Sequence, residues 1–177
     1  MEITQIYSAA VTEFLQKQLY VKSCDNLAFF TLRFNKPKRD CFYAKDDTRR
    51  IYSRMLNQLQ GKNWHKHPLP SVTIIEHGKT NVYHVHSVFN LCEHSMTDLD
   101  IALSNTCHTY PYLYLTYDMQ YLTEMTCPNY SPVMNHLFVK KVFSEDVFNY
   151  VVKEYDFRSD HIDFGNLWTS QAMFNPS

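Results

Sequence analysis

The chain has 177 residues, of which 45% are hydrophobic and 15% aromatic, so it can bury the core of one ordinary domain and is not expected to be disordered. Its formal net charge of −1 gives no overall attraction to nucleic acid. No apolar run approaches the roughly 20 residues that a membrane helix needs, and residues 1–14 lack the basic and apolar regions of a signal peptide. We therefore expect a single domain over residues 1–177 that has no membrane partner.

Cysteine usage bears on the compartment. The five cysteines are odd in number and form no CxxC pair; they lie at positions 24, 41, 92, 107 and 127. This usage predicts reduced thiols and an intracellular protein rather than a disulfide framework. A zinc site at Cys92–His94 or Cys107–His108 is an alternative, but neither spacing matches a zinc module.

The first elements are helix, strand and helix. An amphipathic apolar stripe at residues 3–19 predicts an N-terminal helix within residues 1–22, and residues 27–34 (LAFFTLRF) predict a strand. A second helix is expected to begin at the Asp46–Asp47 pair, with an Asp as its N-cap, and to be closed by Gly61.

Positive charge is concentrated around this second helix. Between Arg33 and Lys66 there are ten Lys or Arg residues and three Asp residues. Such a run is typical either of a surface that meets phosphates or of a solvated helix face with its loop, and charge alone does not separate the two.

A β-hairpin is expected next, from residues 71–76 and 81–89 with the turn HGKTN between them. His84 and His86 lie two positions apart in the second strand, so they share one face of the sheet, while the alternate residues face the core. Two imidazoles on one face predict part of a metal site. The other reading is that both are ordinary, partly exposed surface residues.

Glu76 is the candidate third ligand. If the turn centres on residue 80, Glu76 lies directly opposite His84 on the same face. A tight turn at Gly78–Lys79 would instead rotate Glu76 to the other face and make His77 the nearer candidate.

The rest of the chain predicts shorter elements. They are a capped helix at 95–105, one or two strands within 110–125, a strand at 136–143, a capped helix at 145–155 and an irregular tail at 157–177. The sum is an α+β fold, with a central antiparallel sheet of about five strands and flanking helices.

The expected helix at 145–155 could carry a nucleophile. Its apolar stripe has Tyr155 near the middle and Tyr150 at the edge, and Lys153 lies one turn on from Tyr150. An ammonium at that place favours the phenolate and can hold a phosphate oxygen. The same pair also occurs as a snorkelling Tyr–Lys pair on any amphipathic helix.

Taken in order, three of these segments resemble the three-motif signature of HUH endonucleases of the Rep type. The segments are FFTLRF at 29–34, HVH at 84–86 with Glu76 upstream, and YVVK at 150–153. Members of this family initiate rolling-circle replication of plasmids and small single-stranded DNA viruses. The resemblance covers residues 27–156, in which Phe30, Thr31 and Leu32 match the first motif.

The resemblance implies a mechanism and a set of site residues. Glu76, His84 and His86 would hold a divalent cation, Mg²⁺ or Mn²⁺. Tyr150 would attack the DNA to leave a 5′-phosphotyrosine, and Lys153 would position or neutralise the phosphate. The DNA contacts are expected in the basic run, at Arg33, Lys36, Lys38, Arg39, Arg49 and Arg50.

The implied partner is single-stranded DNA or a hairpin at a replication origin. The chain has no Walker A motif, so the helicase domain of many viral relatives does not lie within these residues, and a separate or host helicase is a candidate partner. The expected location is the cytoplasm of the host cell, or the nucleus of a eukaryotic host, for a protein encoded by a virus, plasmid or mobile element. The alternatives are a single-tyrosine transposase, a mononuclear His/His/Glu metalloenzyme and a non-catalytic nucleic-acid-binding module.

Overall fold

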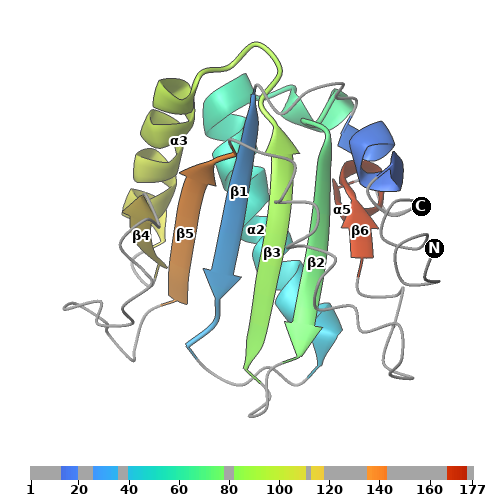
Figure 1. Cartoon of the computed structure of the whole chain (residues 1–177). Coiled ribbons are helices and arrows are strands. Elements are labelled where there is room, and N and C mark those ends of the chain that lie inside the picture. Colours follow the sequence, from blue (N-terminus) through green and yellow to red (C-terminus); the bar gives the residue numbers. More distant parts are fainter. Residues whose placement is uncertain are drawn as a thin grey trace.

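A computed structural model of the chain describes residues 13–19, 26–35, 40–77, 82–110, 113–117, 135–142 and 167–174. The strands are β1 (Leu27–Arg33), β2 (Ser71–His77), β3 (Tyr83–Asn90), β4 (Leu113–Tyr117), β5 (Asn135–Lys141) and β6 (Leu167–Thr169). The helices are α2 (Cys41–Gln60), α3 (Met96–Thr109) and α5 (Ser170–Phe174), together with a 3-10 turn at Trp64–Lys66 and a helical segment at 13–19. The expected α+β class is confirmed (Figure 1).

The strands form one sheet in the order β4-β5-β1-β3-β2-β6 (Figure 1). Every neighbouring pair is antiparallel except β4 and β5, which are parallel. The antiparallel part has five strands, as expected, and β4 adds a sixth at one edge. Because β1 and β3 lie at the centre, the residues that they carry sit in the middle of the sheet rather than at an exposed edge.

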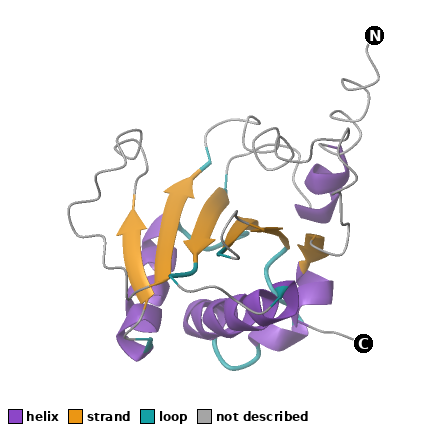
Figure 2. Ribbon diagram, turned by 90° about the horizontal axis from the view of Figure 1, so that it is seen from below, coloured by secondary structure: helices purple, strands orange, loops and turns teal. Residues whose placement is uncertain are grey.

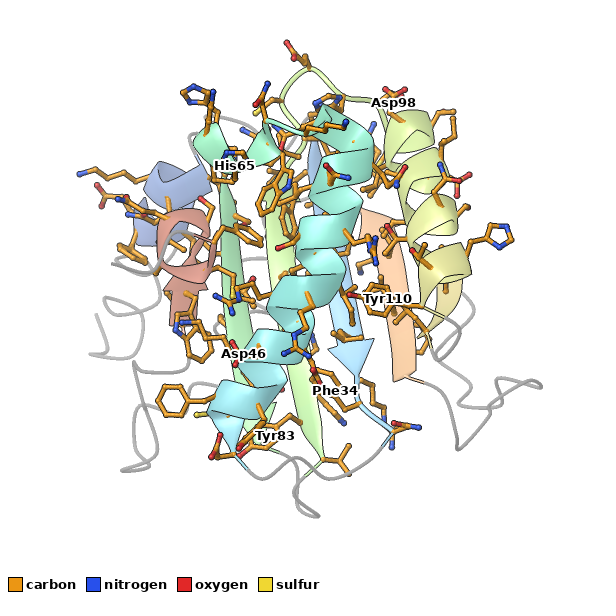
Figure 3. All side chains as sticks on the ribbon, turned by 180° about the vertical axis from the view of Figure 1, so that it is seen from behind. Phe34, Asp46, His65, Tyr83, Asp98 and Tyr110 are labelled. Carbon is orange, nitrogen blue, oxygen red and sulfur yellow. The ribbon has the colours of Figure 1, made fainter. Side chains whose placement is uncertain are left out.

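The helices α2, α3 and α5 form a second layer against one face of the sheet (Figure 2). The main core lies between the two layers, where buried aromatics such as Phe30, Tyr52 and Phe89 contact one another edge to face. Phe34 and Tyr83 belong to the same core, at the end of the sheet where α2 begins (Figure 3). The alternation predicted for the second hairpin strand is therefore correct, because its odd-numbered residues face this core.

A smaller core lies on the opposite face of the sheet. There Leu15 and Leu19 of the helical segment 13–19 pack on apolar residues of the central strands, including Leu27, Val72 and Val88. This segment lies within the N-terminal helix expected over residues 1–22; the remainder of that range is outside the described residues.

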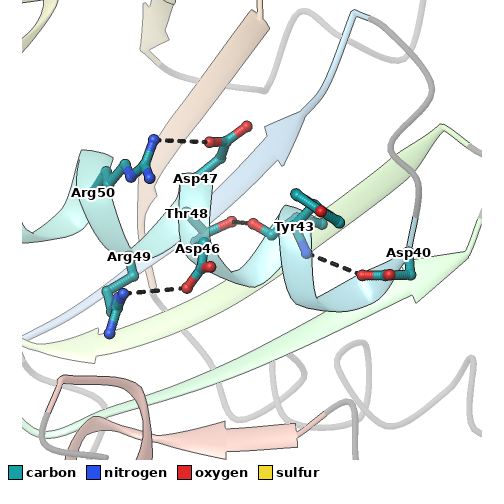
Figure 4. Close-up of polar contacts among 8 residues, drawn as sticks. Asp40, Tyr43, Asp46, Asp47, Thr48, Arg49 and Arg50 are labelled. Atoms are coloured by element: carbon teal, nitrogen blue, oxygen red, sulfur yellow. Dashed lines mark hydrogen bonds and ion pairs between the residues drawn. The ribbon is translucent and has the colours of Figure 1, made fainter.

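Helix α2 begins earlier than expected. Its N-cap is Asp40, whose Oδ1 accepts hydrogen bonds from the backbone N–H groups of Phe42 at 2.9 Å and of Tyr43 at 3.2 Å; Figure 4 shows the bond from Tyr43. The prediction of an N-cap at the Asp46–Asp47 pair was wrong, since both residues lie inside the helix. The closing glycine is confirmed, because Gly61 has φ of 81° and its N–H bonds to the Asn57 carbonyl.

The C-terminal tail is not wholly irregular, contrary to the expectation for 157–177. Strand β6 pairs with β2, its Trp168 is buried, and Met173 of α5 is fully buried in the main core. Phe174 meets the Trp64 ring edge to face, with 5.4 Å between centroids. Elements of three and five residues are too short to show a hydrophobic period, so these tertiary contacts are what define them.

The other expectations divide between described and undescribed residues. Helix α3 begins after Ser95, which forms a capping box with Asp98, as a Ser cap predicts. Strands β4 and β5 fall in the ranges 110–125 and 136–143 almost as expected, whereas the expected helix at 145–155 lies outside the described residues. No helix in the described part of the chain is long and apolar enough to cross a membrane.

Candidate metal centre

The hairpin register brings Glu76 and His84 face to face. In the antiparallel β2–β3 pair, Glu76 is the direct partner of His84 and Ile74 is the partner of His86. The wider turn centred on residue 80 is therefore correct, and the tight turn that would have brought His77 forward is excluded. Glu76, His84 and His86 consequently share one face of the sheet.

His86 is held on three sides. Its Nε2 lies 3.3 Å from Oε2 of Glu76, and its Nδ1 lies 3.1 Å from Oγ1 of Thr31 on the neighbouring strand β1. The ring of Phe29 stacks on the imidazole, with centroids 5.8 Å apart and planes 11° from parallel. Only 5% of His86 is exposed, so these contacts leave the ring one orientation, with Nε2 towards the Glu76 carboxylate.

His84 lies beside a cation. It is the direct partner of Arg33 on β1, just as His86 is the partner of Thr31. Burial lowers the pKa of His84, the charges of Arg33 and of a protonated His86 lower it further, and Glu76 opposes them. The neutral imidazole, which is the form that binds metals, is thus favoured at His84.

Glu76 and His86 suit a divalent cation in chemistry and spacing. Adjacent ligand atoms of an octahedral ion with bonds of about 2.1 Å lie about 3 Å apart, close to the 3.3 Å between Glu76 Oε2 and His86 Nε2. For Nε2 to bind a metal, the ring proton must be on Nδ1, where Thr31 Oγ1 can accept it. Two imidazoles with one carboxylate favour Mn²⁺ over Mg²⁺, because Mg²⁺ prefers oxygen ligands.

The three side chains do not form a closed ligand set as they stand. Among the described residues, no group of three His, Cys, Asp or Glu side chains is gathered closely enough to hold a metal ion. Glu76 and His86 are in contact, whereas His84 shares their face and would have to turn towards them. The Cys92–His94 and Cys107–His108 pairs are likewise not part of any such group.

Comparison of the chain with protein-family models, with curated proteins and with solved structures finds no match. What these side chains can do is therefore inferred from their own geometry and chemistry.

The expected DNA contacts are not all at the same place. Arg33 lies beside the histidines, but Arg49 and Arg50 belong to α2, which covers the other face of the sheet. Both are also engaged with acidic neighbours on their own helix: Arg49 with Asp46 at 3.2 Å and Arg50 with Asp47 at 3.9 Å (Figure 4). The structure thus brings one of these three arginines to the candidate metal centre and separates the other two from it.

Five of the predicted site residues are not among those that the structure describes. Tyr150 and Lys153, the expected nucleophile and its neighbour, lie outside the described residues, as do Lys36, Lys38 and Arg39.

Sequence reasoning missed what supports His86. Thr31 was recognised only as a match to the first motif, whereas its hydroxyl contacts the histidine directly. Phe29 on the same strand stacks on the ring, and Nζ of Lys140 on β5 lies over Phe29, 5.7 Å from its centroid. Period-2 alternation could have put Phe29, Thr31 and Arg33 on one face, but only the β1–β3 pairing identifies that face as the one carrying the histidines.

Proposed function

We propose that the protein is a metal-dependent endonuclease and strand transferase of the HUH type, which nicks and rejoins single-stranded DNA. The observation that carries the proposal is the common sheet face of Glu76, His84 and His86, with Glu76 opposite His84 and in contact with His86. This ligand set needs a residue beyond the described sheet to perform group transfer, and the YVVK segment at 150–153 supplies one in the sequence.

In the proposed reaction, the phenolic oxygen of Tyr150 attacks the phosphorus of the scissile phosphodiester. The new O–P bond forms as the bond to the 3′ oxygen breaks, so the phenol loses its proton and the leaving strand ends in a 3′-OH. Lys153 balances charge on the phosphate. A divalent cation bound by Glu76, His84 and His86 would supply charge stabilisation at the non-bridging oxygens.

The phosphotyrosine ester retains the energy of the broken bond, so the attack of a 3′-OH can reverse the step. One site can therefore both nick and join, as the initiation and completion of rolling-circle replication require. We propose replication initiation for a plasmid or virus as the biological role, inside the host cell and with a separate helicase. A transposase of the same superfamily would use the same chemistry.

Adduct formation tests the proposal. The protein is incubated with Mn²⁺ and a pool of random-sequence single-stranded oligonucleotides labelled at the 3′ end, because the 5′-phosphotyrosine keeps the 3′ portion. The expected product is a labelled protein band that survives denaturation, disappears in Tyr150→Phe and persists in Tyr155→Phe.

Two outcomes would overturn parts of the proposal. An adduct retained in Tyr150→Phe would show that another residue is the nucleophile. If no adduct forms with origin-like hairpins, with the random pool or with any of Mn²⁺, Mg²⁺ and Zn²⁺, the strand-transfer function is wrong.

A further inference from the structure

Charge is unevenly distributed on the sheet face that carries the histidines. From β2 towards β5 along one row of register partners, Glu76 is followed by His84 and then by Arg33. The acidic group is thus on the β2 side and the cation on the β1 side. On β5, the strand beyond β1, Lys140 is the partner of Phe29 and is exposed.

Lys140 belongs to the surroundings of His86. Its Nζ lies 5.7 Å from the centroid of the Phe29 ring, and Phe29 is the ring that stacks on His86. Lys140, Phe29 and His86 therefore form a continuous series of contacts across three adjacent strands, β5, β1 and β3. With Arg33, Lys140 gives this side of the histidine pair two positive charges.

Apolar and aromatic side chains occupy other parts of the same face. Leu15 and Leu19 of the segment 13–19 cover one end of this face, where they cluster with Val72 of β2, Val88 of β3 and Leu27 of β1. Phe138, two residues before Lys140 on β5, lies on the same face and is only partly buried, so it offers an aromatic surface beside the two cations. A polyanion that reaches the histidines is thus attracted by the cations over β1 and β5 and repelled by the Glu76 carboxylate over β2.

We propose that Arg33 and Lys140 bind backbone phosphates of single-stranded DNA, so that the strand crosses β1 and β5 beside the histidine pair. The inference rests on the proposed function for the identity of the ligand. Lys140 was not among the DNA contacts expected from the basic run, which ends at Lys66. Its position on the histidine face comes from the β1–β5 register and from its contact with Phe29.

The chain contains a matched control for Lys140. Lys141 is the next residue of the same strand and is also exposed, but it is the partner of Ala28, whose side chain faces the helix layer. Lys140 and Lys141 therefore carry the same charge and belong to the same strand, but they lie on opposite faces of the sheet. Loss of either charge changes the net charge equally.

The test is equilibrium binding of a fluorescent oligo(dT) to the full chain, with EDTA present and several salt concentrations. Lys140→Ala is expected to weaken binding several-fold and to reduce the slope of log K against log salt concentration by about 0.7, the value for one phosphate contact with a single strand. Lys141→Ala is expected to leave both unchanged. Arg33→Gln should resemble Lys140→Ala, with circular dichroism confirming that each variant is folded.

The outcomes separate this inference from the nuclease. Equal losses in Lys140→Ala and Lys141→Ala, or no loss in Lys140→Ala, would overturn the proposed phosphate path. Since EDTA removes the metal, a selective loss in Lys140→Ala supports the path even if no covalent adduct forms in the separate nicking assay. In that case the DNA-binding surface would stand and the strand-transfer function would fail.

Discussion

The hydroxyl oxygen of Thr31 lies 3.1 Å from Nδ1 of His86, across the pairing of β1 with β3. The two residues are direct register partners, so the contact is set by the backbone of the central strands rather than by a loop. It leaves Nε2 of His86 directed at the Glu76 carboxylate, 3.3 Å away. A hydrogen-bonded partner at the other ring nitrogen is the usual way in which proteins orient a metal-binding histidine.

Replacing Thr31 with Val should weaken metal binding without unfolding the protein. The change removes the acceptor for the Nδ1 proton of His86 but nearly preserves the side-chain volume. Because partners of this kind typically change metal affinity by 10–100-fold, we expect Mn²⁺ affinity to fall about tenfold. Electron paramagnetic resonance of free Mn²⁺ measures this affinity without any nicking reaction.

Thr31→Ser is the rescue for that variant. It keeps the hydroxyl and loses only a methyl group, so Mn²⁺ affinity should return close to the wild-type value. If Thr31→Ser and Thr31→Val weaken Mn²⁺ binding equally, the hydrogen bond between Thr31 and His86 does not support metal binding, and the packing of the Thr31 side chain does.

Glu76→Gln should have a larger effect on Mn²⁺ binding than any change at Thr31. The substitution keeps the shape of the side chain but removes the negative charge that faces both histidines, so we expect most of the Mn²⁺ affinity to be lost. Glu93→Gln is the matched control, since Glu93 is an exposed carboxylate outside the sheet. Calorimetric titration of Mn²⁺ into the three proteins checks this.

His84→Ala decides whether the second histidine is a ligand. In the described structure Glu76 and His86 are in contact, and a closed set of three is not formed. If His84 turns towards them when the ion binds, His84→Ala should lower Mn²⁺ affinity as strongly as His86→Ala. Unchanged Mn²⁺ affinity in His84→Ala would contradict its assignment as a ligand.

The pH dependence of stability should contain a contribution from Asp98. Hydrogen bonds from the Ser95 hydroxyl and then from its backbone N–H hold the pKa of Asp98 below its usual value. A carboxylate with a lowered folded-state pKa stabilises the protein above its unfolded pKa of about 3.9, and this stabilisation is lost as the pH falls through the folded-state pKa. Asp98→Asn should therefore lower stability at pH 7, and this loss should shrink as the pH falls through the folded-state pKa of Asp98.

Urea unfolding of the wild type and Asp98→Asn at pH 7, 4 and 2 measures this contribution. Ser95→Ala removes one of the two hydrogen bonds to Asp98, so its pH dependence should lie between those of the other two proteins. A stability difference between wild type and Asp98→Asn that stays constant with pH would show that the capping carboxylate acts through packing alone.

The parts of the site that could be predicted are those set by local pattern. Period-2 alternation put His84 and His86 on one face, and a single turn length then brought Glu76 opposite His84. The contact of Thr31 with His86 could not be derived, because the two residues are 55 positions apart and the sequence between them contains no local signal for the β1–β3 register. The position of Arg49, on the helix that covers the face opposite the histidines, could not be predicted either. A run of charged residues does not indicate which face of a sheet its helix covers.

In the fold as well, features set by local sequence could be predicted and features set by long-range pairing could not. Gly61 and Ser95 mark helix ends by their own backbone and side-chain chemistry, and both were identified. The start of α2 at Asp40 was missed because the residues that follow it include the exposed Phe42 and Tyr43, which break the apolar stripe. Burial of Trp168 through β6 depends on pairing with β2, nearly one hundred residues earlier.

A buried hydroxyl network joins the helix layer to the hairpin and should contribute to stability. The Tyr52 hydroxyl lies 3.0 Å from Oγ of Ser87, which lies 2.9 Å from Oγ1 of Thr73, and all three residues are fully buried. Thr73 and Ser87 are also direct partners in the β2–β3 register. Burial raises the pKa of Tyr52, so its hydroxyl stays protonated and the network is neutral.

Removing the central hydroxyl of this network should cost more than removing a terminal one. Tyr52→Phe deletes one hydrogen bond and leaves Ser87 bonded to Thr73, so we expect a loss of about 1 kcal/mol in the free energy of unfolding. Ser87→Ala leaves the buried hydroxyls of Tyr52 and Thr73 without this partner, which should cost about 2–3 kcal/mol. Urea unfolding measures both, with the exposed Tyr43→Phe as a control expected to change little. A smaller loss in Ser87→Ala than in Tyr52→Phe would mean that the two remaining hydroxyls find other partners.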